Sequence, residues 1–211
     1  WKNFTATDTS LPFINKPDFT QEWIAKTDVN YAAIHQIPPF SFINQNSETV
    51  TEKTVENKIY VADFFFTTCK TICPIMTKNM HIIQKEIITD NEVMLLSHSV
   101  TPEIDTVAQL KRYAKEKHIN SSKWNLVTGD KKQIYELARK SYLAVKDDGD
   151  GGPFDMVHTE NFMLIDKKRQ IRGFYDGTDS DVMDNLIQDI KILLIPLFHH
   201  QNKVSQKLVK L

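Results

Sequence analysis

The chain has 211 residues, of which 41% are hydrophobic and 25% charged, so it is long enough to bury a core and falls in the globular class. Its 26 basic and 27 acidic residues nearly cancel without a long block of one sign, and nucleic acid is therefore not expected as a partner. No apolar run approaches the roughly 20 residues that cross a bilayer, and the chain starts at Trp1, so we expect a soluble portion without its leader.

Residues 1–35 are predicted to form an N-terminal extension. Over residues 1–26, Pro, Thr, Asn and aromatic residues occur without sustained periodicity, which is typical of an extended arm that packs locally. The aromatic residues expected to anchor it are Phe4, Phe13, Phe19 and Trp23. Beyond this arm, Phe40, Phe42 and Val50 alternate with polar residues around an Asn/Ser turn and predict a small hairpin.

From residue 58 onwards, strand and helix patterns alternate. Continuous apolar runs predict buried strands, and apolar residues three or four positions apart predict helices. Pro74 suits the first turn of the first helix, and Asp130 suits the N-terminal cap of the third. In chain order the predicted elements are strand 58–66, helix 74–88, strand 92–100, helix 105–119, strand 123–129, helix 131–145, hairpin strands 161–166 and 170–177, and helix 179–194.

This order of elements predicts an α/β domain over residues 36–195. Strand–helix–strand units imply parallel crossovers, and the closing hairpin adds antiparallel strands. A thioredoxin-like fold, in which helices flank a central mixed sheet, fits this order best. Residues 196–211 are predicted to be a C-terminal tail.

Both cysteines of the chain, Cys69 and Cys73, lie in the segment TTCKTICPIM, directly after the first buried strand. Open α/β sheets place ligands at the carboxyl ends of their strands, and the start of a helix lowers the pKa of a nearby thiol. Such a pair can close a disulfide or bind a soft or borderline ion such as Cu(I) or Zn²⁺. We favour these chemical roles over that of two small buried hydrophobic side chains.

A third ligand for such an ion is sought among the seven histidines. His158 is the preferred candidate, because it follows a Gly-rich loop and enters the hairpin, and in a thioredoxin-like fold that loop faces the cysteine turn. His98, at the end of a central strand, is its rival. The histidines expected to be solvated rather than ligating are His35, His81, His118, His199 and His200.

Four segments of the chain resemble the Sco/SenC family of copper proteins that assist cytochrome c oxidase assembly. They are FFFTTCKTICPIM, SVTPEIDTVAQLKRYAKEK, WNLVTGDKKQIYELARKSY and VHTENFMLIDKKRQIRGFYDG, and the similarity covers about residues 36–195. The family pattern is C-x-x-x-C-P followed, far downstream, by a histidine before a strand. Cys69, Cys73, Pro74 and His158 fall on this pattern.

The resemblance implies a metallochaperone in which Cys69, Cys73 and His158 bind one copper ion, Cu(I) or Cu(II). Its partners would be other copper chaperones and the oxidase subunit with the binuclear CuA site, to which it passes copper or whose cysteines it reduces. Family members are usually anchored outside the cytoplasmic membrane by an N-terminal helix or lipid, so a periplasmic or outer-face location is expected. Where many members have Pro and Asp after the first cysteine, this chain has Lys70 and Thr71, which removes a carboxylate and adds a cation.

The main alternative is a thiol–disulfide oxidoreductase that reduces cysteines of an oxidase subunit or signals redox state, since the same two sulfurs suit redox exchange. The three residues between the thiols and the lack of proline in VHTEN argue against it, so we favour a metal carrier over an enzyme. A structural zinc site would need four ligands. Asp63, inside the first buried strand, is expected to hydrogen-bond near the motif, to perturb a thiol pKa, or to be structural.

Overall fold

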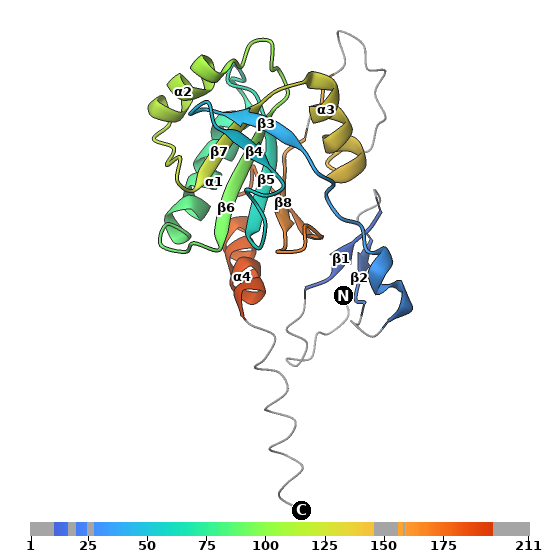
Figure 1. The fold of residues 1–211 in the computed structure, drawn as a ribbon. Helices are drawn as coiled ribbons and strands as arrows, with labels where there is room; N and C mark the ends of the chain where they lie inside the picture. Colours follow the sequence, from blue (N-terminus) through green and yellow to red (C-terminus); the bar gives the residue numbers. More distant parts are fainter. Residues whose placement is uncertain (1–10, 17–19, 25–27, 146–155, 158, 196–211) are drawn as a thin grey trace, which may run out of the picture.

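A seven-stranded mixed sheet forms the centre of the protein (Figure 1). The computed structural model describes residues 11–16, 20–24, 28–145, 156–157 and 159–195. The strand order is β4-β3-β7-β6-β5-β8-β9, in which β5, β6 and β7 are parallel and the outer pairings are antiparallel. The strands are β3 (Ser41–Asn44), β4 (Thr49–Thr51), β5 (Ile59–Phe65), β6 (Val93–Ser99), β7 (Trp124–Thr128), β8 (Asn161–Ile165) and β9 (Ile171–Asp176).

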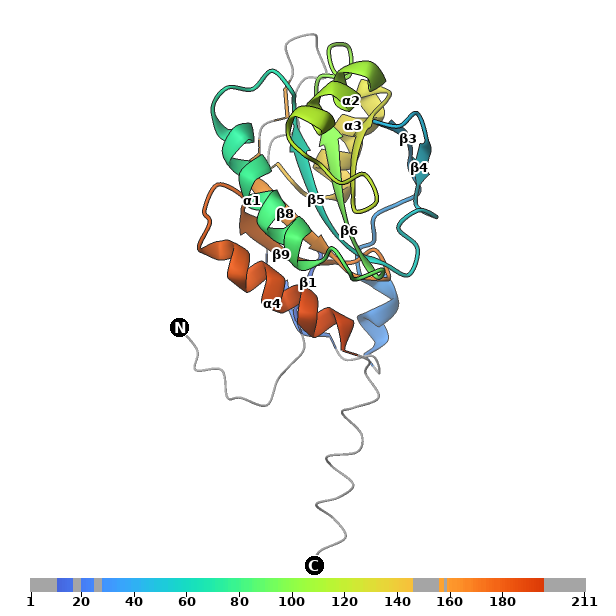
Figure 2. The ribbon, with the colours of Figure 1, turned by 90° about the vertical axis from the view of Figure 1, so that its left-hand side faces the viewer.

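Helices cover both faces of this sheet, as expected for the predicted α/β class (Figures 1 and 2). One face packs against α1, α2 and α4, and the other packs against α3, the π-helix that follows it, and the segment before β3. Every helix within the described ranges is too short or too polar to span a bilayer. The helices are α1 (Ile72–Glu86), α2 (Val107–Glu116), α3 (Lys131–Glu136), η2 (Leu137–Ser141) and α4 (Val182–Leu194).

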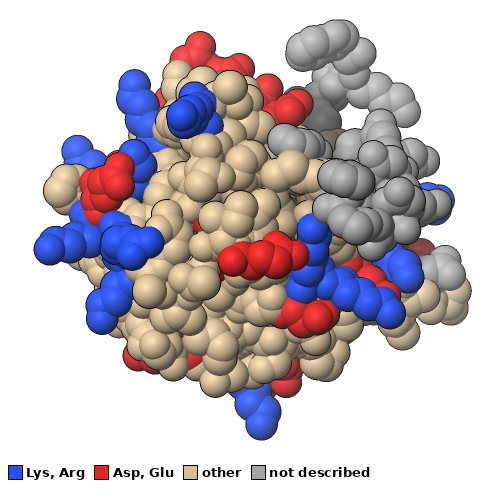
Figure 3. All heavy atoms as spheres, turned by 90° about the horizontal axis from the view of Figure 1, so that it is seen from above, with Lys and Arg blue, Asp and Glu red and all other residues tan. Residues whose placement is uncertain are grey.

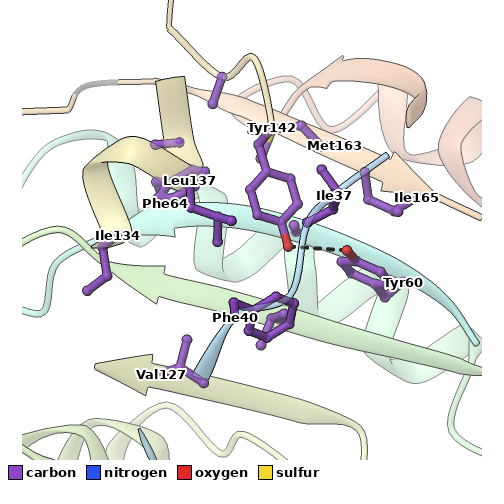
Figure 4. Close-up of a cluster of buried hydrophobic side chains, with 14 of the residues drawn as sticks. Ile37, Phe40, Tyr60, Phe64, Val127, Ile134, Leu137, Tyr142, Met163 and Ile165 are labelled. Carbon is purple, nitrogen blue, oxygen red and sulfur yellow. Dashed lines mark hydrogen bonds between the residues drawn. The ribbon is translucent and has the colours of Figure 1, made fainter. Parts of the chain in front are cut away.

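Strand β5 is buried over its whole length because both of its faces are covered. Val61 and Phe65 point toward the cluster beneath α1, α2 and α4, whereas Tyr60 and Phe64 point toward the opposite cluster. Figure 4 shows this second cluster, in which the hydroxyl of Tyr142 lies 3.3 Å from that of Tyr60. Burying each such large side chain contributes roughly 1.5–3 kcal/mol.

The carboxyl end of β5 and the start of β8 meet at one edge of the sheet. The two strands are antiparallel, and Tyr60 pairs with Ile165 while Ala62 pairs with Met163. The chain therefore leaves β5 toward α1 at the same edge at which it enters β8. This edge is the upper one in Figure 2.

The N-terminal extension differs from the predicted arm. Strands β1 (Phe13–Ile14) and β2 (Gln21–Glu22) pair with each other, and the 3-10 helix η1 (Val29–Ala33) follows. Phe13 packs against β9 rather than locally, because the guanidinium of Arg172 lies 4.1 Å from the centre of its ring. Trp23 is 45% exposed. Phe4 and Phe19 lie outside the described residues.

Hydrogen bonds join this extension to the domain. Arg172 donates from Nε to the carbonyl of Pro12 at 2.8 Å and from Nη2 to the carbonyl of Leu11. The ring Nε2 of His35 lies 2.7 Å from the carbonyl of Ser141. His35 is therefore half-buried and has a backbone partner. The prediction that it is solvated is wrong.

Helix ends depart from the predictions where polar side chains terminate the backbone hydrogen bonding. Thr106 caps α2 by accepting from the N–H of Gln109, so α2 starts two residues later than predicted. Asp130 caps α3 as predicted, accepting from the N–H of Gln133 at 2.8 Å. The helix predicted over 131–145 becomes a π-helix halfway and ends at Ser141.

His98 lies inside the aromatic cluster on the face opposite the cysteines. Its ring stacks on Phe64 with centroids 5.0 Å apart, and it contacts the edges of Phe40, Phe42 and Tyr142. Its exposed fraction is 0%. The sheet separates it from the thiols, so His98 is not the rival ligand that the sequence suggested.

Replacing His98 by Phe is expected to flatten the loss of stability in acid. Burial lowers the pKa of the imidazole from 6.5 to about 4, against the opposing hydrogen bond to the backbone of Asp63. Unfolding therefore takes up a proton, and stability that is fully present above pH 6.5 is lost as the pH falls through about 4, by up to about 3 kcal/mol. Denaturant unfolding from neutral pH to about pH 4 measures this loss.

The exposed histidine variant His118→Asn provides the control, because it should retain the wild-type pH dependence. Parallel stability curves for the wild type and His98→Phe would contradict the assignment of this acid sensitivity to His98.

Candidate metal centre

Cys69 lies on the loop between β5 and α1, which we call the thiol loop, and Cys73 is the second residue of α1. The backbone N–H of Cys69 donates to the carbonyl of Phe66 at 3.3 Å, which closes a turn. The backbone N–H of Cys73 in turn donates to Sγ of Cys69 at 3.5 Å. The two sulfurs are not joined in a disulfide. The prediction that both cysteines lie at a strand-to-helix turn is thus confirmed.

The two thiols differ in environment. Cys69 is half-buried, whereas Cys73 is 3% exposed and belongs to the core beneath α1. Burial opposes ionisation of Cys69, but hydrogen bonds from the backbone of Cys73 and Thr71 and from their side chains outweigh it and lower its pKa to about 7. Burial raises the pKa of Cys73 to about 12, with further contributions from Cys69 and Asp63.

From the sequence alone, Thr71 is a departure from the family pattern with no assigned role. In the structure its hydroxyl lies 3.6 Å from Sγ of Cys69 and can donate to the thiolate. The signal for this contact was a hydroxyl residue two positions after a cysteine at a turn. Lys70, the other departure, is exposed.

Asp63 is buried in β5 beneath the thiol loop. Its carboxyl group hydrogen-bonds to Ser97, whose hydroxyl accepts from Nε1 of Trp124 at 2.7 Å, while its Oδ1 has no hydrogen-bond partner among the described residues. Burial raises the pKa of Asp63 to about 7, and the Ser97 hydrogen bond opposes this. Its charge contributes to the raised pKa of Cys73, which is one of the roles expected for it.

The third predicted ligand, His158, lies outside the described residues and stays a prediction. Its described neighbours Val157 and Thr159 are buried, and Thr159 accepts from the backbone N–H of Asn161 at 3.2 Å where β8 begins. In the part of the chain that the structure describes, no group of three His, Cys, Asp or Glu side chains could hold a metal.

The other histidines within the described ranges do not join the thiols. His81 is half-buried against the ring of Trp124, with Nδ1 3.2 Å from Nε2 of Gln84, so it is not simply solvated. His118 is exposed as expected. His199 and His200 lie outside the described residues.

Sequence reasoning missed a buried carboxyl group at the same edge. Asp105 is fully buried, and it accepts hydrogen bonds from Thr67, Ser99 and Thr101. The sequence pattern predicts a helix that begins at this residue. The available signal was the density of hydroxyl residues around it in SHSVTPEIDT.

The Thr71 hydroxyl is expected to keep the Cys69 thiol acidic. Thr71→Val removes the hydroxyl but keeps the shape and the backbone N–H, so the pKa of Cys69 should rise from about 7 toward its ordinary value of 9.0. Less thiolate at neutral pH means slower alkylation by iodoacetamide, by roughly threefold to tenfold. Thr71→Ser should retain the wild-type rate. An unchanged rate in Thr71→Val would attribute the low pKa to the backbone N–H groups alone.

Asp63→Asn is expected to stabilise the reduced protein increasingly as the pH rises. Because burial raises the pKa of Asp63 from 3.8 to about 7, the folded state retains a proton that the unfolded state releases. Stability that is fully present below pH 3.8 is therefore lost as the pH rises through about 7, by up to about 4 kcal/mol, whereas the amide cannot ionise. Denaturant unfolding across this range should show a growing advantage of the variant; a constant difference would contradict the raised pKa.

Comparisons with known proteins point to one family. The sequence profile of the SCO1/SenC family matches residues 30–194. The SCO1 protein homolog of Bacillus subtilis (strain 168) is 33% identical over 168 residues, which cover 79% of this chain and 84% of that protein. A SCO1/SenC family lipoprotein from Bacillus anthracis matches with a TM-score of 0.68 and 29% identity, over 82% of this chain and 100% of its own. Arabidopsis thaliana ScoI, solved with copper bound, matches with a TM-score of 0.58 and 28% identity, over 73% of this chain and 97% of its own.

These relatives share the thioredoxin-like fold that the order of elements predicted. The family consists of copper-binding proteins associated with cytochrome c oxidase assembly. The family profile spans most of the chain and includes β5, both cysteines and helix α1. The chain therefore belongs to the SCO1/SenC family.

Proposed function

We propose that the protein is a copper carrier that assists assembly of the CuA site of cytochrome c oxidase. It holds one copper ion, Cu(I) or Cu(II), through Cys69, Cys73 and His158. The proposal rests mainly on the two free cysteines at the strand-to-helix turn, where the backbone N–H of Cys73 reaches Sγ of Cys69. Copper is the cargo of this protein, which receives it and passes it on.

The donor set suits copper. Thiolates are soft ligands that select Cu(I), and imidazole binds both Cu(I) and Cu(II), so one site can accept either oxidation state. Cys69 is about half ionised at neutral pH because its pKa is about 7, whereas Cys73 must lose its proton on metal binding. Copper affinity should therefore increase with pH. The copper-bound state of Arabidopsis ScoI supports the choice of metal.

The pairing of β5 with β8 supports His158 as the third ligand. The antiparallel register brings the start of β8 to the edge where β5 ends and the thiol loop begins. Thr159, next to His158 in sequence, is buried at this start and bonded to Asn161. We therefore propose that the imidazole of His158, which precedes β8 in sequence, supplies the third ligand.

The surface at this edge supports a protein partner. Figure 3 looks down on the edge, and uncharged side chains cover much of the described part of this face, although an acidic group lies near its middle with basic groups beside it. Ile75 in α1 and Ile104 between β6 and α2, both of which follow the thiol loop in sequence, are 46% and 54% exposed. The partners we propose are the oxidase subunit with the CuA site and other copper chaperones.

An extracytoplasmic location at the membrane fits the fold. Strands β1 and β2 lie toward the lower end of the molecule in Figures 1 and 2, away from the edge with the thiol loop. We propose that a membrane anchor precedes Leu11 in the sequence. The lipoprotein from Bacillus anthracis supports such an anchor on the outer face of the cytoplasmic membrane or in the periplasm.

Thiol–disulfide exchange is the second candidate, and the unequal thiols favour it. The Cys69 thiolate would attack a target disulfide and release one target thiolate, forming a mixed disulfide. The Cys73 thiolate would then attack Sγ of Cys69, which closes the Cys69–Cys73 disulfide and releases the second thiolate. Two electrons pass to the target. A half-exposed, acidic first thiol and a buried second one suit these steps.

Anaerobic copper titration of the fully reduced protein distinguishes the two functions. We expect one tightly held copper per chain, with thiolate-to-copper charge-transfer absorption, that is lost in Cys69→Ser and Cys73→Ser. His158→Ala should weaken binding by roughly tenfold or more. The exposed control His118→Ala should bind like the wild type. A wild type that holds no copper yet reduces a disulfide substrate would establish the oxidoreductase, and unchanged affinity in His158→Ala would remove that ligand.

A further inference from the structure

Asp105 is a fully buried carboxyl group whose hydrogen bonds reach the thiol loop. The hydroxyl of Thr67 donates to Oδ1 at 2.5 Å, and the backbone N–H of Thr67 donates to Oδ2 at 3.1 Å. The hydroxyls of Ser99 and Thr101 donate to Oδ2 at 2.6 and 3.2 Å. A buried carboxyl group is costly unless its oxygens are satisfied, and here both oxygens are.

These bonds join two neighbouring strand ends. Ser99 is the last residue of β6, and Thr101 follows it on the way to α2, whereas Thr67 follows β5. The backbone N–H of Val100 donates to the carbonyl of Phe65 at 2.9 Å, so the two strands are still paired where the loops begin. Asp105 therefore ties the thiol loop to the β6–α2 loop at the end of the parallel ladder.

Thr67 is a central residue of the turn that positions Cys69. The carbonyl of Phe66, just before Thr67, accepts the N–H of Cys69, and the backbone of Phe66 also hydrogen-bonds to the Cys73 sulfur. Any displacement of Thr67 moves Phe66 and the Cys69 N–H together. It therefore changes the distance from the Cys73 N–H to Sγ of Cys69.

The same threonine has a second support from α2. Its hydroxyl accepts from Nε2 of Gln109 at 3.0 Å, and the side chain of Gln109 in turn accepts from Nη2 of Arg112. The Thr67 hydroxyl thus uses its one proton on Asp105 and one lone pair on Gln109. A hydroxyl is required at this position, because no other small side chain both donates and accepts in this way.

We propose that Asp105, acting through Thr67, is the positioning residue that sets the geometry of the Cys69–Cys73 pair and thereby the reactivity of Cys69. The inference goes beyond the proposed function, because it concerns the sulfurs whether they bind copper or exchange disulfides. Without the Asp105 carboxylate, the hydroxyl and the backbone N–H of Thr67 lose the group that accepts both of their hydrogen bonds. The turn then shifts, and the Cys73 N–H no longer faces Sγ of Cys69.

The test compares Asp105→Asn and Thr67→Val with the wild type in three measurements on the metal-free, reduced protein. They are the rate of alkylation of Cys69 by iodoacetamide near neutral pH, identified by peptide mass analysis; the thiol–disulfide equilibrium against glutathione; and denaturant unfolding. We expect both variants to alkylate roughly threefold to tenfold more slowly and to shift the glutathione equilibrium. Thr67→Ser, which keeps the hydroxyl, should restore the wild-type values.

Asp166→Asn is the matched control. Asp166 is also buried, accepts backbone N–H bonds from Lys168 and Gln170, and pairs with Arg172 at 2.9 Å, but it follows β8 at the opposite edge of the sheet. It should lose stability with thiol reactivity unchanged. Wild-type alkylation and glutathione equilibrium in Asp105→Asn, or in Thr67→Val if the first variant does not fold, would overturn the inference. Because the test uses no copper, its outcome is separate from that of the copper titration.

Discussion

Burial of β5 on both faces is the constraint on which the position of the thiols depends. A strand covered by helices on one side and by the π-helix and N-terminal segment on the other can leave the core only at its ends. At its carboxyl end the backbone turns into α1. The N–H groups in the first turn of a helix have no partner within the helix, and one of them, that of Cys73, donates to the sulfur of Cys69. The low pKa of Cys69 thus follows from the place where a fully buried strand has to end.

The same burial gives the core two ionisable side chains of opposite behaviour. Asp63 and His98 occupy adjacent strands one position apart in register, and they point to opposite faces of the sheet. Burial favours the neutral form of each, so it raises the pKa of the carboxyl group and lowers that of the imidazole. Their effects on stability oppose each other between about pH 4 and pH 7. Only Asp63 lies on the face of the thiols, so only it can influence them.

Much of the fold could be predicted because its elements have a strong local signal. The apolar runs of β5, β6 and β7 predicted strands that are buried throughout, and Asp130 predicted the start of α3 from its side chain alone. Helix ends were less predictable where a polar residue serves another element. Asp105 reads as the first residue of a helix, but its carboxyl group is used by Thr67 and Ser99, so α2 begins at Val107.

The candidate site divides in the same way. The spacing of Cys69 and Cys73, a strand before them and a proline-containing helix turn after them are local features, and the sequence by itself determined that the pair lies at a strand-to-helix turn. The tertiary structure alone decided the environment of each sulfur, the placement of His98 across the sheet from them, and the support of their loop by Asp105. The physical reason is that secondary structure follows from the periodicity of neighbouring residues, whereas burial and hydrogen bonding depend on residues that are distant in the chain and meet only when the sheet is assembled.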